Sequence, residues 1–366
     1  MVANEPQSAI IARPPANICG TALGPAESEA DLSQAEIAQA GEDRLVIHDL
    51  VKRDPLTDFA EDVRRGLSSQ SKQFFPKYLY DELGSQLFEA ICLLPEYYPT
   101  RAENEILTHY ADEIVELTGR PNTLIEMGSG SASKTRLLIE ALLRTQSALL
   151  FVPVDISASA LESSSRILLQ SYPSLRIEAY AAEYFNGLEA LSNMPRGRTL
   201  ALFLGSNISN FEPAEAHAFL RATRAMLRHG DALLLGADLK KDREVLEAAY
   251  NDAHGVTAAF SRNILARINR QLGGHFDLRT FRHHAFFNEE KSRIEIHLES
   301  NKSQTISIDQ LDLEVRFTAG ELIHAENSYK YDLDDIAGFA LQSGFKCERT
   351  WLDQLKQFSS NLLLAV

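Results

Sequence analysis

A turn of small residues follows a short apolar run near the middle of the chain, in the segment Glu126-Met127-Gly128-Ser129-Gly130. Glycines at the end of a strand let a ligand approach the backbone closely, and the N-terminus of a following helix offers unpaired N–H groups to a negative group. Lys134, one turn into the expected helix, is placed to pair with a ligand carboxylate. Because a Gly-Ser turn is also a common structural connection, this segment alone indicates only that a ligand can bind here.

Two more strand ends carry side chains suited to a nucleoside. Asp155 ends the second apolar run, where a carboxylate can accept both hydrogen bonds of a ribose diol. Glu183 and Tyr184 follow the third run, where an acid can accept from the adenine amine and a ring can stack on the base. Each residue also has an ordinary alternative, such as an N-cap for Asp155 or solvent exposure for Lys134 and Glu183. Their coincidence at three successive strand ends favours a nucleoside site.

The spacing of the glycines distinguishes between the candidate cofactors. A dinucleotide fingerprint needs a third glycine for close helix packing, and this chain has Ser133 at that position. A phosphate-binding P-loop needs Gly-Lys followed by Ser or Thr, and no such sequence is present. A ligand that combines adenosine with an amino-acid carboxylate fits Asp155 and Lys134 better. We therefore expect S-adenosyl-L-methionine (SAM), which would leave as S-adenosyl-L-homocysteine.

These side chains need a parallel sheet to bring the strand ends together. From residue 122 onward, short apolar runs alternate with helical spacing, which is typical of parallel strands joined by crossover helices. Ligands bind beyond the carboxyl ends of such strands, where the chain order reverses. The predicted fold class is α/β, with a doubly wound, Rossmann-like sheet. We expect strands at 123–127, 148–154, 176–181, 199–204 and 232–237, and helices that include 132–143, 158–170 and 213–227.

The alternation stops after Lys240, which predicts a second lobe. Residues 241–272 have helical spacing, and residues 278–329 show strand-like alternation that favours an antiparallel sheet. A helix at 332–343 and strands near 345–351 and 361–366 return to α/β character. We expect a disordered tail over residues 1–44, an α+β substrate-binding lobe formed by 45–103 plus 241–330, and a Rossmann-like domain formed by 104–240 plus 331–366.

Composition excludes several classes of protein. The 366 residues carry a net charge of -15 with no visible basic patch, so a nucleic-acid partner is not expected. No apolar run is long enough to span a membrane, and the first residues lack the features of a signal peptide. Three widely separated cysteines indicate neither a disulfide framework nor a thiolate metal site. We therefore expect a cytoplasmic protein without a membrane partner; its oligomeric state stays open, a monomer included.

Ten histidines raise the question of a metal. His283 and His284 are adjacent, so they point to opposite faces of a strand, and no His-x-x-x-His or Cys-x-x-Cys pair accompanies them. We expect solvated or core histidines and no bound metal.

Three motifs, taken together, point to a family. They are Leu94-Pro95-Glu96-Tyr97-Tyr98-Pro99-Thr100-Arg101, the turn from Glu126 to Gly130, and Phe203-Leu204-Gly205-Ser206-Asn207-Ile208-Ser209-Asn210. With these motifs the chain resembles the histidine-specific N-α-methyltransferases of ergothioneine biosynthesis, which make the trimethylated betaine hercynine. The resemblance extends from about Leu56 to the C-terminus. It implies a SAM-dependent methyltransferase sheet, a second substrate-binding lobe and L-histidine as the small-molecule substrate.

The resemblance also implies roles for individual residues on the cofactor side. Tyr80 matches a tyrosine that closes over the cofactor site. At the place of Glu183 and Tyr184 the family more typically has Asp-Phe. The cofactor contacts of the family match Gly128, Lys134, Asp155, Glu183 and Tyr184, with Gly130 in the same turn.

On the substrate side, the residues that contact histidine in the family match Tyr97, Gly205, Asn210 and Tyr250. The two residues that bind the imidazole in the family match Glu326 and Ser328. A carboxylate and a hydroxyl satisfy both imidazole nitrogens, and such a pocket leaves polar groups unpaired when an apolar side chain enters. Ile296 stands where the family commonly has methionine, an apolar exchange that the pocket should tolerate.

The expected reaction is an in-line displacement by the neutral α-amine of histidine on the sulfonium methyl, repeated three times. Alignment of the reacting atoms supplies most of the acceleration. An amine with a pKa near ~8 is already partly neutral, so no catalytic base is assigned, and Tyr97 is a candidate partner of the amine. Two alternatives stay open: a methyltransferase of another amino acid or small amine, and a non-catalytic SAM-binding homologue that regulates a partner. Intact Asn210, Tyr250, Glu326 and Ser328 count against the second.

Overall fold

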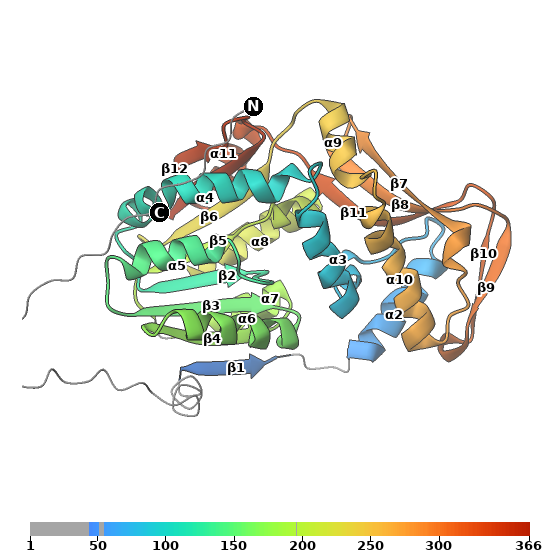
Figure 1. The fold of residues 1–366 in the computed structure, drawn as a ribbon, viewed down its shortest axis with the longest axis horizontal. Coiled ribbons are helices and arrows are strands. Elements are labelled where there is room, and N and C mark those ends of the chain that lie inside the picture. Colours follow the sequence, from blue (N-terminus) through green and yellow to red (C-terminus); the bar gives the residue numbers. More distant parts are fainter. Residues whose placement is uncertain (1–43, 51–54, 195) are drawn as a thin grey trace, which may run out of the picture.

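A computed structural model describes residues 44–50, 55–194 and 196–366 of the chain (Figure 1). The tail predicted over residues 1–44 lies outside these ranges except for Arg44, and so does Cys19. Within the described ranges, no helix has the length and apolar character needed to cross a membrane.

An eight-stranded sheet forms the larger part of the molecule, in the order β1-β4-β3-β2-β5-β6-β13-β12. From β2 the chain winds outward through β3 and β4, then returns to the other side of β2 with β5 and β6, so the order reverses between β2 and β5. Only β13 runs against the other strands of this sheet, pairing antiparallel with β6 and β12. The predicted doubly wound α/β fold is confirmed. The strands are β1 (Leu45–Asp49), β2 (Thr123–Met127), β3 (Leu149–Asp155), β4 (Leu175–Ala181), β5 (Thr199–Phe203), β6 (Ala232–Asp238), β12 (Phe345–Leu352) and β13 (Phe358–Ala365).

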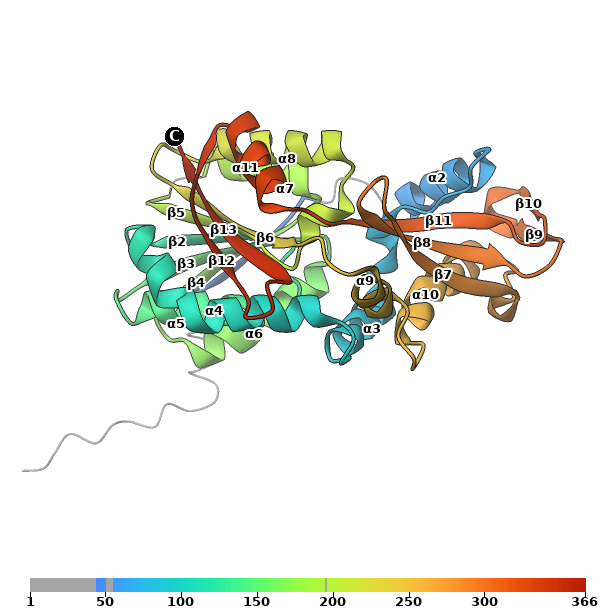
Figure 2. The same cartoon turned by 90° about the horizontal axis from the view of Figure 1, so that it is seen from above.

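Helices cover both faces of this sheet, which explains why its central strands are apolar throughout. Every residue of β2, β5 and β6 is buried. One face packs against α4 (Tyr98–Leu117), α5 (Thr135–Leu143) and α6 (Ala158–Ser171). The other packs against α7 (Tyr184–Ser192), α8 (Pro213–Met226) and α11 (Leu333–Gln342), and Figure 2 shows the two layers on either side of the strands.

The second lobe has its own sheet and its own hydrophobic core. The predicted antiparallel strands are present as a three-stranded sheet in the order β11-β8-β7 and a hairpin of β9 and β10. Its strands are β7 (Phe281–Asn288), β8 (Arg293–Ser300), β9 (Gln304–Ile308), β10 (Leu313–Phe317) and β11 (Leu322–Tyr329). Its helices are α2 (Pro55–Ser68), η1 (Pro76–Leu79), α3 (Glu82–Cys92), α9 (Arg243–Tyr250), α10 (Val256–Leu272), η3 (Leu278–Thr280) and η4 (Asp309–Leu311).

Two predicted boundaries are corrected by the structure. Residues 45–49 were expected in the second lobe, but β1 pairs parallel with β4 at the edge of the large sheet. Arg44 fastens this strand, because its guanidinium donates to the carbonyls of Leu169 and Tyr172 at 3.1 and 3.0 Å. The helix expected from residue 132 begins at Thr135 instead, since Ala132 has a φ of 52° and belongs to the preceding loop.

Candidate active site

The glycine-rich loop after β2 is shaped by two left-handed glycines. Gly128 has a φ of 73°, and a Cβ there would lie 2.8 Å from both the Asn207 amide nitrogen and the Tyr184 hydroxyl. Gly130 has a φ of 50°, and a Cβ there would meet nothing within 4 Å. The loop is therefore closed against the protein at Gly128 and open at Gly130, where a ligand can approach the backbone.

Glu126, in β2, holds this loop through two hydrogen bonds. Its buried carboxylate accepts hydrogen bonds from the hydroxyls of Ser129, at 2.6 Å, and Thr135. Burial raises the pKa of Glu126 to about 7, although both hydroxyls oppose the shift. The side chain thus ties the start of the loop to the first residue of α5.

Asp155, at the end of β3, lies directly against the loop. Its carboxylate accepts the backbone N–H groups of Gly130 and Ser157, each at 3.0 Å. Burial raises the pKa of Asp155, and these backbone hydrogen bonds oppose the rise. The sequence prediction that Asp155 shares a site with the glycines of the loop agrees with this contact.

Lys134 has a protein partner, which the sequence did not indicate. Its ammonium pairs with the carboxylate of Glu103 on α4, a side chain with 0% exposure. The same carboxylate accepts the backbone N–H of Gly205 at 2.8 Å. Glu103 therefore connects a predicted cofactor residue to a predicted substrate residue.

The predicted adenine contacts lie at the end of β4. Glu183 is half exposed and accepts a hydrogen bond of 2.8 Å from Lys77, so an element of the second lobe reaches the large domain here. The Tyr184 ring packs edge-on against Phe203, Phe211 and Phe219. These three rings fix the tyrosine beside the loop.

All the predicted substrate residues line one cavity between the two parts of the molecule. The β5–α8 connection, with η2 (Asn207–Asn210), forms one wall, and α3, the α9–α10 region, β8 and β11 form the others. Asn207 lines this cavity and also lies against Gly128, so the cavity adjoins the glycine-rich loop. The cavity brings together Tyr80, Tyr97, Gly205, Asn210, Tyr250, Ile296, Glu326 and Ser328.

A β-bulge turns Glu326 into the cavity. The register of β11 against β8 shifts between His324 and Glu326, so that His324 pairs with His297 and Glu326 pairs with Ile296. An extra residue in one strand re-aims the side chains that follow it. As a result Glu326 and Ile296 face the same cavity, whereas the His324 ring packs edge-on against His297 outside it.

Glu326 is the carboxylate of this cavity. Burial raises its pKa to about 7, and the nearby Lys330 ammonium and a hydrogen bond with Tyr80 oppose the rise. Tyr80, expected on the cofactor side, thus lies in the same cavity as the predicted substrate residues, with its ring against Phe88 and Phe260.

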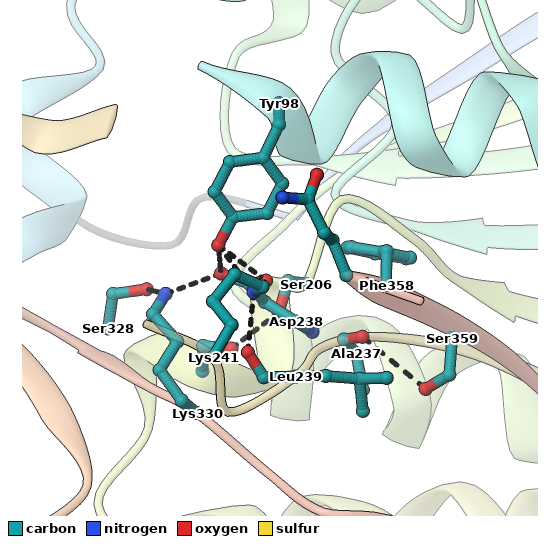
Figure 3. Close-up of polar contacts among 12 residues, drawn as sticks. Tyr98, Ser206, Ala237, Asp238, Leu239, Lys241, Ser328, Lys330, Phe358 and Ser359 are labelled. Atoms are coloured by element: carbon teal, nitrogen blue, oxygen red, sulfur yellow. Dashed lines mark hydrogen bonds and ion pairs between the residues drawn. The ribbon is translucent and has the colours of Figure 1, made fainter. Parts of the chain in front are cut away.

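Sequence reasoning missed three buried charged residues next to the site, Glu103, Asp238 and Lys330. Figure 3 shows Asp238 and Lys330. Lys330 had a signal, because Glu326, Ser328 and Lys330 alternate and so share one face of a strand. Asp238 had one too, since it ends the apolar run of β6 as Asp155 ends that of β3. Nothing in the sequence of α4 marks Glu103 as buried.

His283 is a core histidine, as expected. It is buried, and its ring nitrogens contact the Ser261 hydroxyl at 3.1 Å and the Tyr250 carbonyl at 2.8 Å. Among the residues that the structure describes, no group of three or more His, Cys, Asp or Glu side chains could hold a metal ion.

Comparison with known proteins gives the family. A family model described as histidine-specific methyltransferase, SAM-dependent, matches residues 59–365. A histidine N-alpha-methyltransferase of Mycolicibacterium smegmatis is 40% identical over 301 residues, which cover 82% of this chain and 93% of that protein. Another, of Mycobacterium tuberculosis, is 41% identical over 302 residues, covering 82% and 93%. Ergothioneine biosynthesis protein 1 of Schizosaccharomyces pombe is 27% identical over 294 residues, covering 78% of this chain and 38% of that protein.

The family model spans nearly all of the described chain, and the two bacterial relatives are matched over almost their whole length. The chain therefore belongs to the histidine-specific, SAM-dependent methyltransferases.

Proposed function

We propose that this enzyme transfers methyl groups from SAM to the α-amine of L-histidine, up to the trimethylated betaine hercynine, in ergothioneine biosynthesis. The observation that carries the proposal is the single cavity that joins a buried carboxylate, Glu326, to the hydroxyls of Ser328 and Tyr250 beside the glycine-rich loop. The relatives named above act on histidine or belong to ergothioneine biosynthesis by name.

The loop suits the cofactor assigned to it. The open side of Gly130 leaves room for a ligand at the backbone, and Asp155 and Lys134 offer a carboxylate and an ammonium on either side of the loop. Gly128, Gly130, Lys134, Asp155, Glu183 and Tyr184 would hold SAM. When bound, SAM supplies a methyl group on a sulfonium centre.

The cavity suits histidine. The Glu326 carboxylate accepts an N–H of the imidazole, and the Ser328 hydroxyl donates to its other nitrogen. Asn210 is a neutral donor for the substrate carboxylate, the Tyr250 hydroxyl donates to the Ser328 oxygen, and Ile296 packs against the ring. An apolar amino acid would leave the buried Glu326 carboxylate without the imidazole N–H, which discriminates strongly against such a substrate.

Tyr97 is the candidate partner of the amine. Its side chain is buried, lines the cavity, and is held edge-on against Phe88 and Tyr250. Burial raises the pKa of Tyr97, so the group stays a neutral phenol that can orient an amine without removing its proton. Rate acceleration then comes mainly from holding the reacting atoms in line.

Mass spectrometry of the purified protein with SAM and a panel of amino acids tests the proposal. We expect successive gains of one, two and three methyl groups on histidine, and none on tryptophan, phenylalanine or glutamine. Methylation of a different amino acid would replace the substrate. No methylation together with tight binding of S-adenosylhomocysteine would favour a regulatory protein.

A further inference from the structure

Lys330 is fully buried, directly behind the hydroxyls that line the cavity. Its ammonium lies 2.7 Å from the Asp238 carboxylate, 2.7 Å from the Ser328 hydroxyl and 3.0 Å from the Tyr250 hydroxyl. An ammonium has three N–H donors and no acceptor. All three donors therefore have an acceptor, and both hydroxyl oxygens receive a hydrogen bond from behind.

This arrangement prevents both hydroxyls from donating toward Lys330. Tyr250 and Ser328 also bond to each other at 2.8 Å, so one of them donates to the other. Two hydroxyls carry two hydrogens, and the mutual bond uses one. The remaining hydrogen is left for a ligand in the cavity, so the pair offers a donor there.

We propose that Lys330 is a positioning residue for substrate specificity: its ammonium holds the Tyr250 and Ser328 oxygens as acceptors, so that the pair presents a hydroxyl hydrogen to the substrate. Glu326, on the same strand face, presents an acceptor. One donor beside one acceptor complements a neutral imidazole, which has one bare nitrogen and one N–H. The inference rests on the proposed function and deepens it.

Asp238 holds Lys330 in place from the large sheet. It is the last residue of β6, and its carboxylate also accepts from the Tyr98 hydroxyl at 2.8 Å and pairs with Lys241 (Figure 3). Burial alone would lower the pKa of Lys330, but the attraction of Asp238 outweighs it and the pKa lies above its usual value. Lys330 therefore stays charged at neutral pH.

Lys241 provides a matched control. It pairs with the same Asp238 carboxylate, but its other partners are the Tyr98 hydroxyl and the Leu239 carbonyl, and it contacts neither Tyr250 nor Ser328. Lys330→Met and Lys241→Met each remove one ammonium from Asp238. Only Lys330→Met removes the hydrogen bonds that an ammonium donates to the Tyr250 and Ser328 hydroxyls.

The test is titration calorimetry of L-histidine into protein saturated with S-adenosylhomocysteine, with separate titrations of S-adenosylhomocysteine itself. We expect Lys330→Met to weaken histidine binding at least about tenfold, the range for a hydrogen bond to a charged group, and to leave S-adenosylhomocysteine affinity within about twofold. Lys241→Met should weaken histidine binding less than Lys330→Met. In a Ser328→Ala background, Lys330→Met should cost less than in the wild type, because one of the hydroxyls that it holds is gone.

Equal losses of histidine affinity in both lysine variants would overturn the inference, as would wild-type affinity in Lys330→Met. If Lys330→Met does not fold, Lys330→Leu, which likewise has no N–H donor, enters the same comparison, and histidine affinity equal to that of the wild type would count against the inference. Wild-type protein that binds no histidine would refute the proposed function instead. The lysine variants are then compared with the amino acid that the panel identifies.

Discussion

Gly205 donates its backbone N–H to the Glu103 carboxylate of α4 at 2.8 Å, and the same carboxylate pairs with Lys134. The loop after β5 and the helix after the glycine-rich turn thus share one buried acid. A Cβ at Gly236 in β6 would lie 2.1 Å from the same carboxylate, so the absence of a side chain at Gly236 leaves the space that Glu103 occupies. The site depends on a residue with no expected ligand contact.

Glu103→Ala should destabilise the protein by about 3 kcal/mol, because it leaves the Gly205 N–H and the Lys134 ammonium without their buried partner. Combined with Lys134→Ala, the loss should be smaller than the sum of the two single losses. Urea unfolding measures both. The control is Glu162→Ala, which breaks the exposed pair with Arg166 and should cost below about 1 kcal/mol. Equal costs for Glu103→Ala and Glu162→Ala would contradict the assigned role of Glu103.

The two glycines of the cofactor loop should respond differently to alanine. Gly128→Ala places a Cβ 2.8 Å from the Asn207 and Tyr184 side chains, so it should lower the melting temperature of the ligand-free protein. Gly130→Ala meets no protein atom within 4 Å, so it should be less destabilising, while it fills the space offered to the ligand. We expect Gly130→Ala to weaken S-adenosylhomocysteine binding at least about tenfold. Thermal unfolding and calorimetry check the two halves, and an unchanged affinity in Gly130→Ala would place the ligand elsewhere.

Tyr97→Phe should lower kcat about tenfold with little change in the KM for histidine, since it removes one oriented hydrogen bond to the amine and keeps the ring packing. The neighbouring Tyr98→Phe is the comparison. Its hydroxyl binds Asp238 and Lys241, so its loss should mainly reduce stability. Steady-state kinetics with histidine as the varied substrate separates the two tyrosines. A larger fall in kcat for Tyr98→Phe would exchange their roles.

The fold could be predicted from the sequence where burial was complete. The strands β2, β5 and β6 read as continuous apolar runs because both of their faces are covered, and their bounds were predicted to within a residue. The edge strand β1 was placed in the wrong part of the molecule because none of its five residues is buried, so it lacks the continuous apolar run of a central strand. Its partner, β4, lies far away in sequence.

The candidate site could be predicted where polar residues end strands or match a motif. Asp155 and the glycine-rich loop are in contact, and the predicted substrate residues share one cavity. Glu103 could not be found in this way, because a helix pattern does not distinguish a buried carboxylate from a solvated one. The bulge at His324 and Glu326 was equally invisible, since an unbroken alternation would place both side chains on one face.

The advantage of a carboxylate at Glu326 should depend on pH. Its pKa of about 7 means that the charged, accepting form predominates above pH 7 and is lost as the pH falls below it. Glu326→Gln keeps an amide oxygen but cannot be charged, and it should bind histidine at least about tenfold more weakly than the wild type at pH 8. At pH 5.5 most wild-type carboxylates are protonated, so the ratio of the two dissociation constants should shrink by about tenfold. Calorimetry of histidine binding to both proteins, saturated with S-adenosylhomocysteine, measures this ratio. Protonation of the histidine imidazole and amine affects both dissociation constants alike, so to first order it cancels in the ratio. A ratio that stays constant between the two pH values would show that Glu326 does not bind the substrate as a carboxylate.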